Sequence, residues 1–162
     1  MKLSMAESIM SEVVIPNLSI TPIFEGVSET WMLATAALAM LISLLEAWLA
    51  TLIVYGRLDA LKKVIVAPHN LIRSHVDYTI MTALLGFTYL VVVWLGIELP
   101  KWVIVLLCVG VLYNPFGFLV KAFKPTAGQA ETVLGRIAVC AGFLPTTIGF
   151  GYVMFAVLVR VI

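Results

Sequence analysis

The sequence predicts an all-α integral membrane protein, and three observations lead to this class. Hydrophobic residues make up 62% of the 162 residues, whereas soluble domains contain roughly 45–50%. Charged residues make up only 12%. Four apolar stretches are each close to the roughly 20 residues that a helix needs to cross a bilayer. The net charge of +1 argues against a nucleic-acid partner, so the lipid bilayer is the expected surroundings.

The apolar stretches predict four membrane-spanning helices in one four-helix bundle, residues 31–162. The first helix contains a single carboxylate, Glu46, and the second begins in a polar cluster. The third and fourth contain no Asp, Glu, Lys, Arg or His. Pro100 and Lys101 predict a tight turn that makes the second and third helices antiparallel neighbours. The expected helices are residues 31–55, 72–99, 102–120 and 137–159.

Residues 1–30 predict an interfacial or partner-contacting arm, because Pro16 and Pro22 interrupt any long helix there. Between the helices, four Lys or Arg residues fall in the first long loop and three in the second, against three on the opposite side. Positive charge is enriched in cytoplasmic loops. We therefore expect a multi-pass protein of the bacterial inner-membrane type, with both longer loops in the cytoplasm.

Polar residues are expected to gather in the cytoplasmic half of the bundle. On the second helix they recur at helical spacing along one face, and a similar stripe follows the third helix. Such stripes predict a cavity that opens toward the cytoplasm, although small residues at this spacing also allow close helix packing. The first stripe is His75, Thr79, Thr82, Gly86 and Tyr89, and the second is Gly110, Asn114, Gly117 and Lys121.

Two of these polar residues are candidates for chemistry. Inserting a charge at the centre of a membrane helix costs on the order of 2.5–3.5 kcal/mol. Glu46 should therefore face the interior, where it either serves function, with or without a bound proton, or makes a structural hydrogen bond. His75 could ligate a metal or haem iron, act as an acid or base, or cap the helix at the interface. Arg73 and Asp77, four residues apart, could form an ion pair at the helix end.

Two motifs resemble those of a known family. Arg73-Ser74-His75 opens the second helix, and Asn114 to Pro125, NPFGFLVKAFKP, closes the third. This order is similar to the small four-helix membrane isomerases typified by styrene oxide isomerase. A histidine followed two residues later by an acid, here His75 and Asp77, is similar to the related hydroxylaminobenzene mutases. The resemblance covers nearly the whole chain.

The resemblance implies a homotrimer that binds haem b, with His75 as the axial iron ligand and Arg73 and Phe118 beside the cofactor. Ferric iron would act as a Lewis acid on a small hydrophobic epoxide and yield an aldehyde. Alternatively, the reaction would transfer a hydroxyl group within one substrate molecule. The family has a tyrosine where this chain has Phe118, and an asparagine where it has Met81. The candidate catalytic residues are Asn114, Tyr78, Tyr113, Glu46 and Asp77.

Two other functions stay open at this point. The chain could be a haem-linked electron carrier or an interaction subunit without enzymatic activity. It could also be a small transporter that uses Glu46 as its protonatable group, although no internal repeat of the kind common in transporters is present.

Overall fold

The structure is a computed structural model that describes residues 26–127 and 132–162. These residues form five helices and contain no strand. Most of the expected N-terminal arm, residues 1–25, lies outside the described residues. The helices are α2 (Thr30–Val54), α3 (Asp59–Val64), α4 (Pro68–Leu95), α5 (Lys101–Phe123) and α6 (Val133–Val161).

Four of these helices are long and apolar enough to cross a membrane, namely α2, α4, α5 and α6. They contain 25, 28, 23 and 29 residues. A rise of about 1.5 Å per residue makes each longer than the roughly 30 Å hydrocarbon core. The structure therefore confirms the predicted fold class, an all-α membrane bundle.

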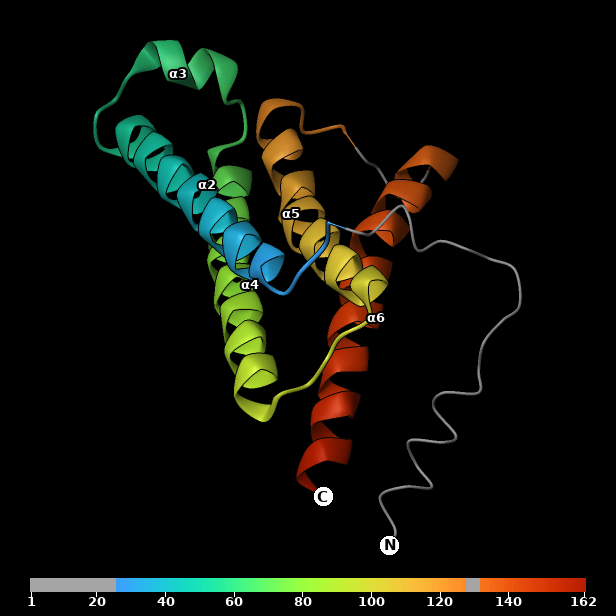
Figure 1. Ribbon diagram of the computed structural model, residues 1–162. Coiled ribbons are helices and arrows are strands. Elements are labelled where there is room, and N and C mark those ends of the chain that lie inside the picture. The colour runs from blue at the N-terminus through green and yellow to red at the C-terminus, as the bar shows by residue number, and fades with distance from the viewer. Residues whose placement is uncertain (1–25, 128–131) are drawn as a thin grey trace, which may run out of the picture.

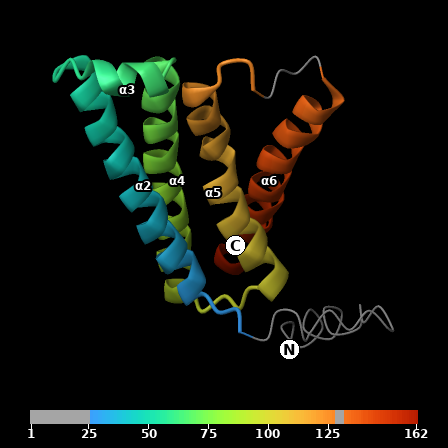
Figure 2. The ribbon, with the colours of Figure 1, turned by 90° about the horizontal axis from the view of Figure 1, so that it is seen from above.

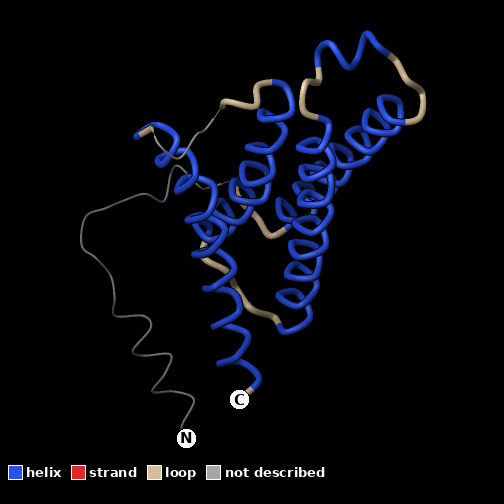
Figure 3. Tube along the Cα trace, turned by 180° about the vertical axis from the view of Figure 1, so that it is seen from behind, coloured by secondary structure: helices blue, strands red, loops and turns tan. Residues whose placement is uncertain are grey.

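The long helices pack in chain order, α2 against α4, α4 against α5, and α5 against α6 (Figure 1). The short helix α3 lies across one end of the bundle, and the α4–α5 connection lies at the opposite end (Figure 2). Figure 3 shows that the loops of the described chain are confined to these two ends. At the α3 end, α6 leans away from α5.

The second membrane helix starts and stops earlier than the sequence predicted. Pro68 occupies its first turn, where the missing N–H costs no helical hydrogen bond. The helix ends at Leu95 because Gly96 adopts a left-handed conformation with φ of 61°, which glycine accepts readily. The connection to α5 is therefore the segment 96–100, and not a tight turn at Pro100 and Lys101.

Buried apolar residues form two clusters along the bundle. The larger lies toward the α4–α5 connection and includes Met32, Tyr78, Leu85, Leu107 and Val111. The smaller lies toward α3 and consists of Ile53, Ile65, Leu71 and Ala122. Many large apolar side chains point outward instead, including Leu45, Trp48, Leu90, Trp94 and Phe155. An exposed apolar belt of this kind matches a lipid environment.

Candidate functional site

A layer of buried polar groups separates the two apolar clusters. Ser43 and Glu46 contribute to it from α2, and Ser74 contributes from α4. Each lies between a residue of the larger cluster and a residue of the smaller cluster along its own helix. Buried polar groups are costly in hydrocarbon unless they are hydrogen-bonded, so their partners define what this layer can do.

His75 faces α2 and is held there by Ser43. The Nδ1 atom of His75 lies 2.9 Å from the Ser43 backbone oxygen and 2.8 Å from the Ser43 hydroxyl. The same hydroxyl lies 2.7 Å from the hydroxyl of Thr79, and Thr82 donates a hydrogen bond to the Ala36 backbone oxygen. The first predicted stripe therefore does share one helical face, and that face packs on α2.

Glu46 is directed into the bundle, as expected, and its side chain is only 2% exposed. Its Oε1 lies 2.8 Å from the Ser74 hydroxyl, within hydrogen-bonding distance. The Ser74 hydroxyl also lies 3.2 Å from the backbone oxygen of Pro115 on α5. Among the described residues, Glu46 Oε2 is the buried side-chain oxygen or nitrogen that has no hydrogen-bond partner.

Tyr78 makes a second polar link from α4 to α5. It is 2% exposed and donates a 2.9 Å hydrogen bond to the Leu112 backbone oxygen. Pro115 follows three residues later inside α5. A proline removes one helical N–H and tilts the preceding carbonyl groups away from the helix. Tyr78 and Ser74 thus bind carbonyl groups of the helical segment around Pro115.

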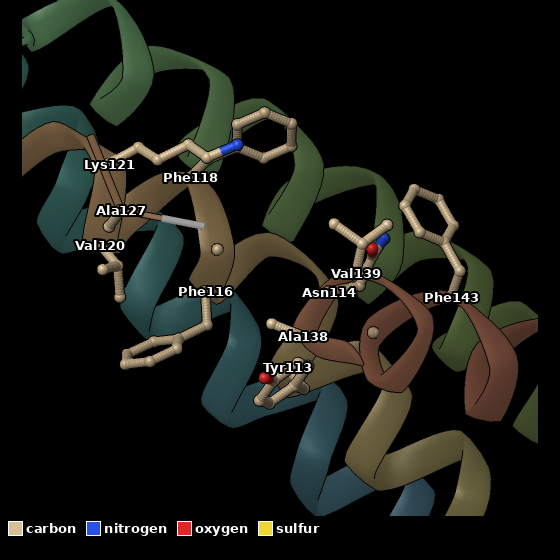
Figure 4. Close-up of a pocket in the computed structure, with 12 residues that line it drawn as sticks. Tyr113, Asn114, Phe116, Phe118, Val120, Lys121, Ala127, Ala138, Val139 and Phe143 are labelled. Carbon is tan, nitrogen blue, oxygen red and sulfur yellow. The ribbon is translucent and has the colours of Figure 1, made fainter. Parts of the chain in front are cut away.

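Asn114 and Tyr113 lie elsewhere, in a cavity of ≈ 260 Å³ between α5 and α6 (Figure 4). Deeper in the bundle the two helices come close at Gly110, where an added Cβ would meet the Oγ1 atom, the backbone nitrogen and the Cα of Thr146. The helices diverge from this crossing toward α3, which leaves the cavity. The lining residues are Tyr113, Asn114, Phe116, Gly117, Phe118, Val120, Lys121, Ala127, Ala138, Val139, Gly142 and Phe143.

The remaining predicted residues meet in a hollow of ≈ 310 Å³ between α4 and α5. Arg73, Asp77 and Phe118 line it together with two apolar residues of α4. Phe118 also lines the α5–α6 cavity, where the Lys121 ammonium lies 6.0 Å from its ring centre (Figure 4). The possible Arg73–Asp77 ion pair is not formed within the described part of the chain. Met81 packs beside the core.

Within the described chain, the two polar stripes that were expected to share one cavity face different neighbours. The stripe on α4 faces α2 through His75, whereas Asn114 on α5 faces α6 and lies beside Gly142. The reason is the packing order, since each inner helix has a different neighbour on each side. Glu46 and Tyr78 share the central layer, and Asn114 and Tyr113 share the α5–α6 cavity.

Ser74 is the functional candidate that sequence reasoning missed, because it was interpreted only as the middle residue of the Arg73-Ser74-His75 motif. Its spacing of four residues from Tyr78 places both on one helical face. Pro115 on the third helix was a second signal, because a proline inside a helix disturbs the backbone hydrogen bonding around it, where side chains of a neighbouring helix can bind carbonyl groups.

The fold and these groups define a multi-pass all-α membrane protein with a buried carboxylate and a histidine anchored between two helices. No family model, curated protein or solved structure matches the chain.

Proposed function

We propose that the chain is a haem-binding membrane isomerase that holds haem b through His75 and acts on a small apolar, epoxide-like molecule from the bilayer. The observation that carries this proposal is the hydrogen bond between His75 Nδ1 and the Ser43 backbone oxygen, 2.9 Å long. We assign the hydrogen to Nδ1, because a carbonyl oxygen can only accept a hydrogen bond. The Ser43 hydroxyl then donates to the His75 backbone oxygen, which lies 3.0 Å away.

This tautomer leaves the lone pair of a neutral His75 on Nε2. Metal-ligating histidines commonly donate the other ring N–H to a backbone carbonyl or carboxylate, which fixes the ring and raises its basicity. Among the described residues, Nε2 makes no hydrogen bond. The Nε2 atom of His75 could therefore hold a haem iron, with the orientation of the imidazole ring set by its contact with α2.

The proposal also requires a second copy of the chain. Neither of the two hollows described above is lined by His75. Within one chain His75 faces α2 and Asn114 faces α6, so the two can serve one substrate only across a contact between copies. The homotrimer that the sequence motifs suggest would supply such a contact, and its cyclic symmetry would repeat it.

When bound, ferric haem would supply a Lewis acid for the epoxide oxygen. The chain would provide the surroundings: the Asn114 amide can orient a polar oxygen, while Phe116 and Phe143 line the same cavity. Aromatic faces attract a developing positive charge, and an apolar lining excludes water that would capture it. Arg73 and Phe118 line the α4–α5 hollow, which His75 does not, so they too would reach the cofactor only across a contact between copies.

Absorption spectroscopy tests the proposal directly. Protein purified in detergent from cells supplied with haem should show a Soret band and a native mass of three chains. His75→Ala should lose the band, whereas His69→Ala should keep it, because His69 is exposed in the first turn of α4. Wild-type protein that stays colourless after addition of haemin would contradict the proposal.

Turnover then separates the isomerase from the other functions. Conversion of a styrene-type epoxide to its aldehyde without reductant supports isomerisation. Reduction of the bound haem by a quinol, without epoxide conversion, would instead assign the chain as an electron carrier.

A further inference from the structure

The contacts of Glu46 specify where hydrogens lie in the central polar layer. Its Oε1 is 2.8 Å from the Ser74 hydroxyl, and that hydroxyl is 3.2 Å from the Pro115 backbone oxygen. A serine hydroxyl has a single hydrogen to donate. A backbone oxygen can only accept, and so can an ionised carboxylate. With Glu46 ionised, the two acceptor oxygens would have to share that one hydrogen, which weakens both contacts.

No Lys or Arg side chain of the described residues balances a charge on Glu46, and His75 could do so only if it carried a proton on both ring nitrogens. Within the described residues, its carboxyl group forms no ion pair with Lys or Arg, and Oε2 has no hydrogen-bond partner. The titratable side chains near enough to interact with it are His75 and Tyr78, both on α4. Tyr78 directs its hydroxyl to the Leu112 oxygen, and His75 directs Nδ1 to Ser43. From α5, the group in contact with Ser74 is the Pro115 carbonyl.

A proton on Glu46 resolves both difficulties. We infer that Glu46 is a membrane-embedded proton-binding site, in which the neutral carboxyl group donates to Ser74 and Ser74 donates to the Pro115 backbone oxygen. The hydrogens of the Glu46 carboxyl group and the Ser74 hydroxyl then each have an acceptor. The two hydrogen bonds run from α2 through α4 to α5 and join the three helices. The remaining Oε2 is an uncharged oxygen that can accept a hydrogen bond from water or a small polar molecule. This inference does not depend on haem binding by His75.

Infrared spectroscopy at neutral pH tests the inference on the full-length protein in detergent or lipid. The wild-type protein should show the carbonyl stretching band of a protonated carboxylic acid, and Glu46→Gln should lose it. Glu98→Gln is the matched control, because Glu98 is exposed in the α4–α5 connection and lies outside the central polar layer. That variant should keep the band unchanged.

A second variant covers the case in which Glu46→Gln does not fold. Ser74→Ala keeps the carboxyl group but removes its hydrogen-bond acceptor, so the band should persist and move to higher wavenumber. Absence of the band from the wild-type protein would overturn the inference. A band that Glu46→Gln leaves in place would overturn it too, because the proton would then belong to another residue.

Discussion

At the scale of single residues, the polar side chains of α4 act mainly on backbone groups of neighbouring helices. Ser74 and Tyr78 bind carbonyl groups near Pro115, and His75 binds the Ser43 carbonyl. Such bonds matter in a membrane because no water is present to replace a lost partner. These side chains therefore fix the orientation of α4 about its own axis between α2 and α5. This orientation determines that His75 faces α2.

Tyr78→Phe should lower the free energy of unfolding by about 1 kcal/mol, because it removes one net hydrogen bond to the Leu112 oxygen. Unfolding in mixed micelles with increasing denaturing detergent measures the change. Tyr89→Phe is the matched control, since Tyr89 makes no hydrogen bond within the described residues and lies on the same helix. Equal stability of the two variants would show that the Tyr78 hydroxyl contributes nothing.

At the scale of helices, a single pair of close contacts positions the α5–α6 cavity. A Cβ on Gly110 would lie 2.8 Å from the Thr146 backbone nitrogen, and one on Gly149 would lie 2.9 Å from the Leu107 side chain. Small residues allow membrane helices to approach each other closely. Thr146 also donates to the Gly142 backbone oxygen just beyond Pro145, which supports α6 where its own hydrogen bonding is interrupted.

Gly110→Ala should therefore destabilise the bundle by about 1–3 kcal/mol, as expected when a methyl group is forced into a packed contact. Gly86→Ala should have the opposite effect and stabilise the bundle by up to about 1 kcal/mol, because alanine has a higher helix propensity than glycine. A Cβ on Gly86 meets no atom within 4 Å. The same detergent unfolding assay compares both variants, and destabilisation by Gly86→Ala of similar size would refute the packing argument.

The helices and their polar faces could be predicted from sequence, but the partners of those faces could not. The apolar runs located α2, α4, α5 and α6, and the spacing of His75, Thr79 and Thr82 placed them on one face. Which neighbour that face meets depends on packing between helices far apart in the chain, as in the contact of Ser43 with His75. Helical spacing alone therefore could not show that Asn114 belongs to a different cavity.

At the scale of the whole molecule, the two ends of the bundle differ in charge. The end with α3 and the α5–α6 connection carries Lys62, Lys63, Lys121 and Lys124, whereas the α4–α5 connection carries Glu98 beside Lys101 (Figure 2). Positive charge sets orientation during membrane insertion. The arrangement therefore predicts that the α3 end lies in the cytoplasm.

Cysteine labelling tests this orientation. The native cysteines are free, with Cys108 buried and Cys140 exposed, so both are first replaced by alanine. Glu98→Cys in that background should react with an impermeant maleimide in intact cells, because the expected orientation places the α4–α5 connection outside. Lys62→Cys should react only after permeabilisation. The reverse pattern would show that the bundle is inserted the other way round.

The contacts at the α3 end determine how a molecule could enter the α5–α6 cavity. The Ala67 backbone nitrogen donates to the Ala122 oxygen at 3.0 Å, and the Asn70 amide donates to the Lys121 oxygen at 3.3 Å. These bonds fasten the start of α4 to the end of α5, so the two helices form one wall. The opposite wall is the first half of α6, which ends at the natural bending point of Pro145. The width of the α5–α6 cavity is therefore set by the angle of this one helical arm, because the other wall is fastened at its end.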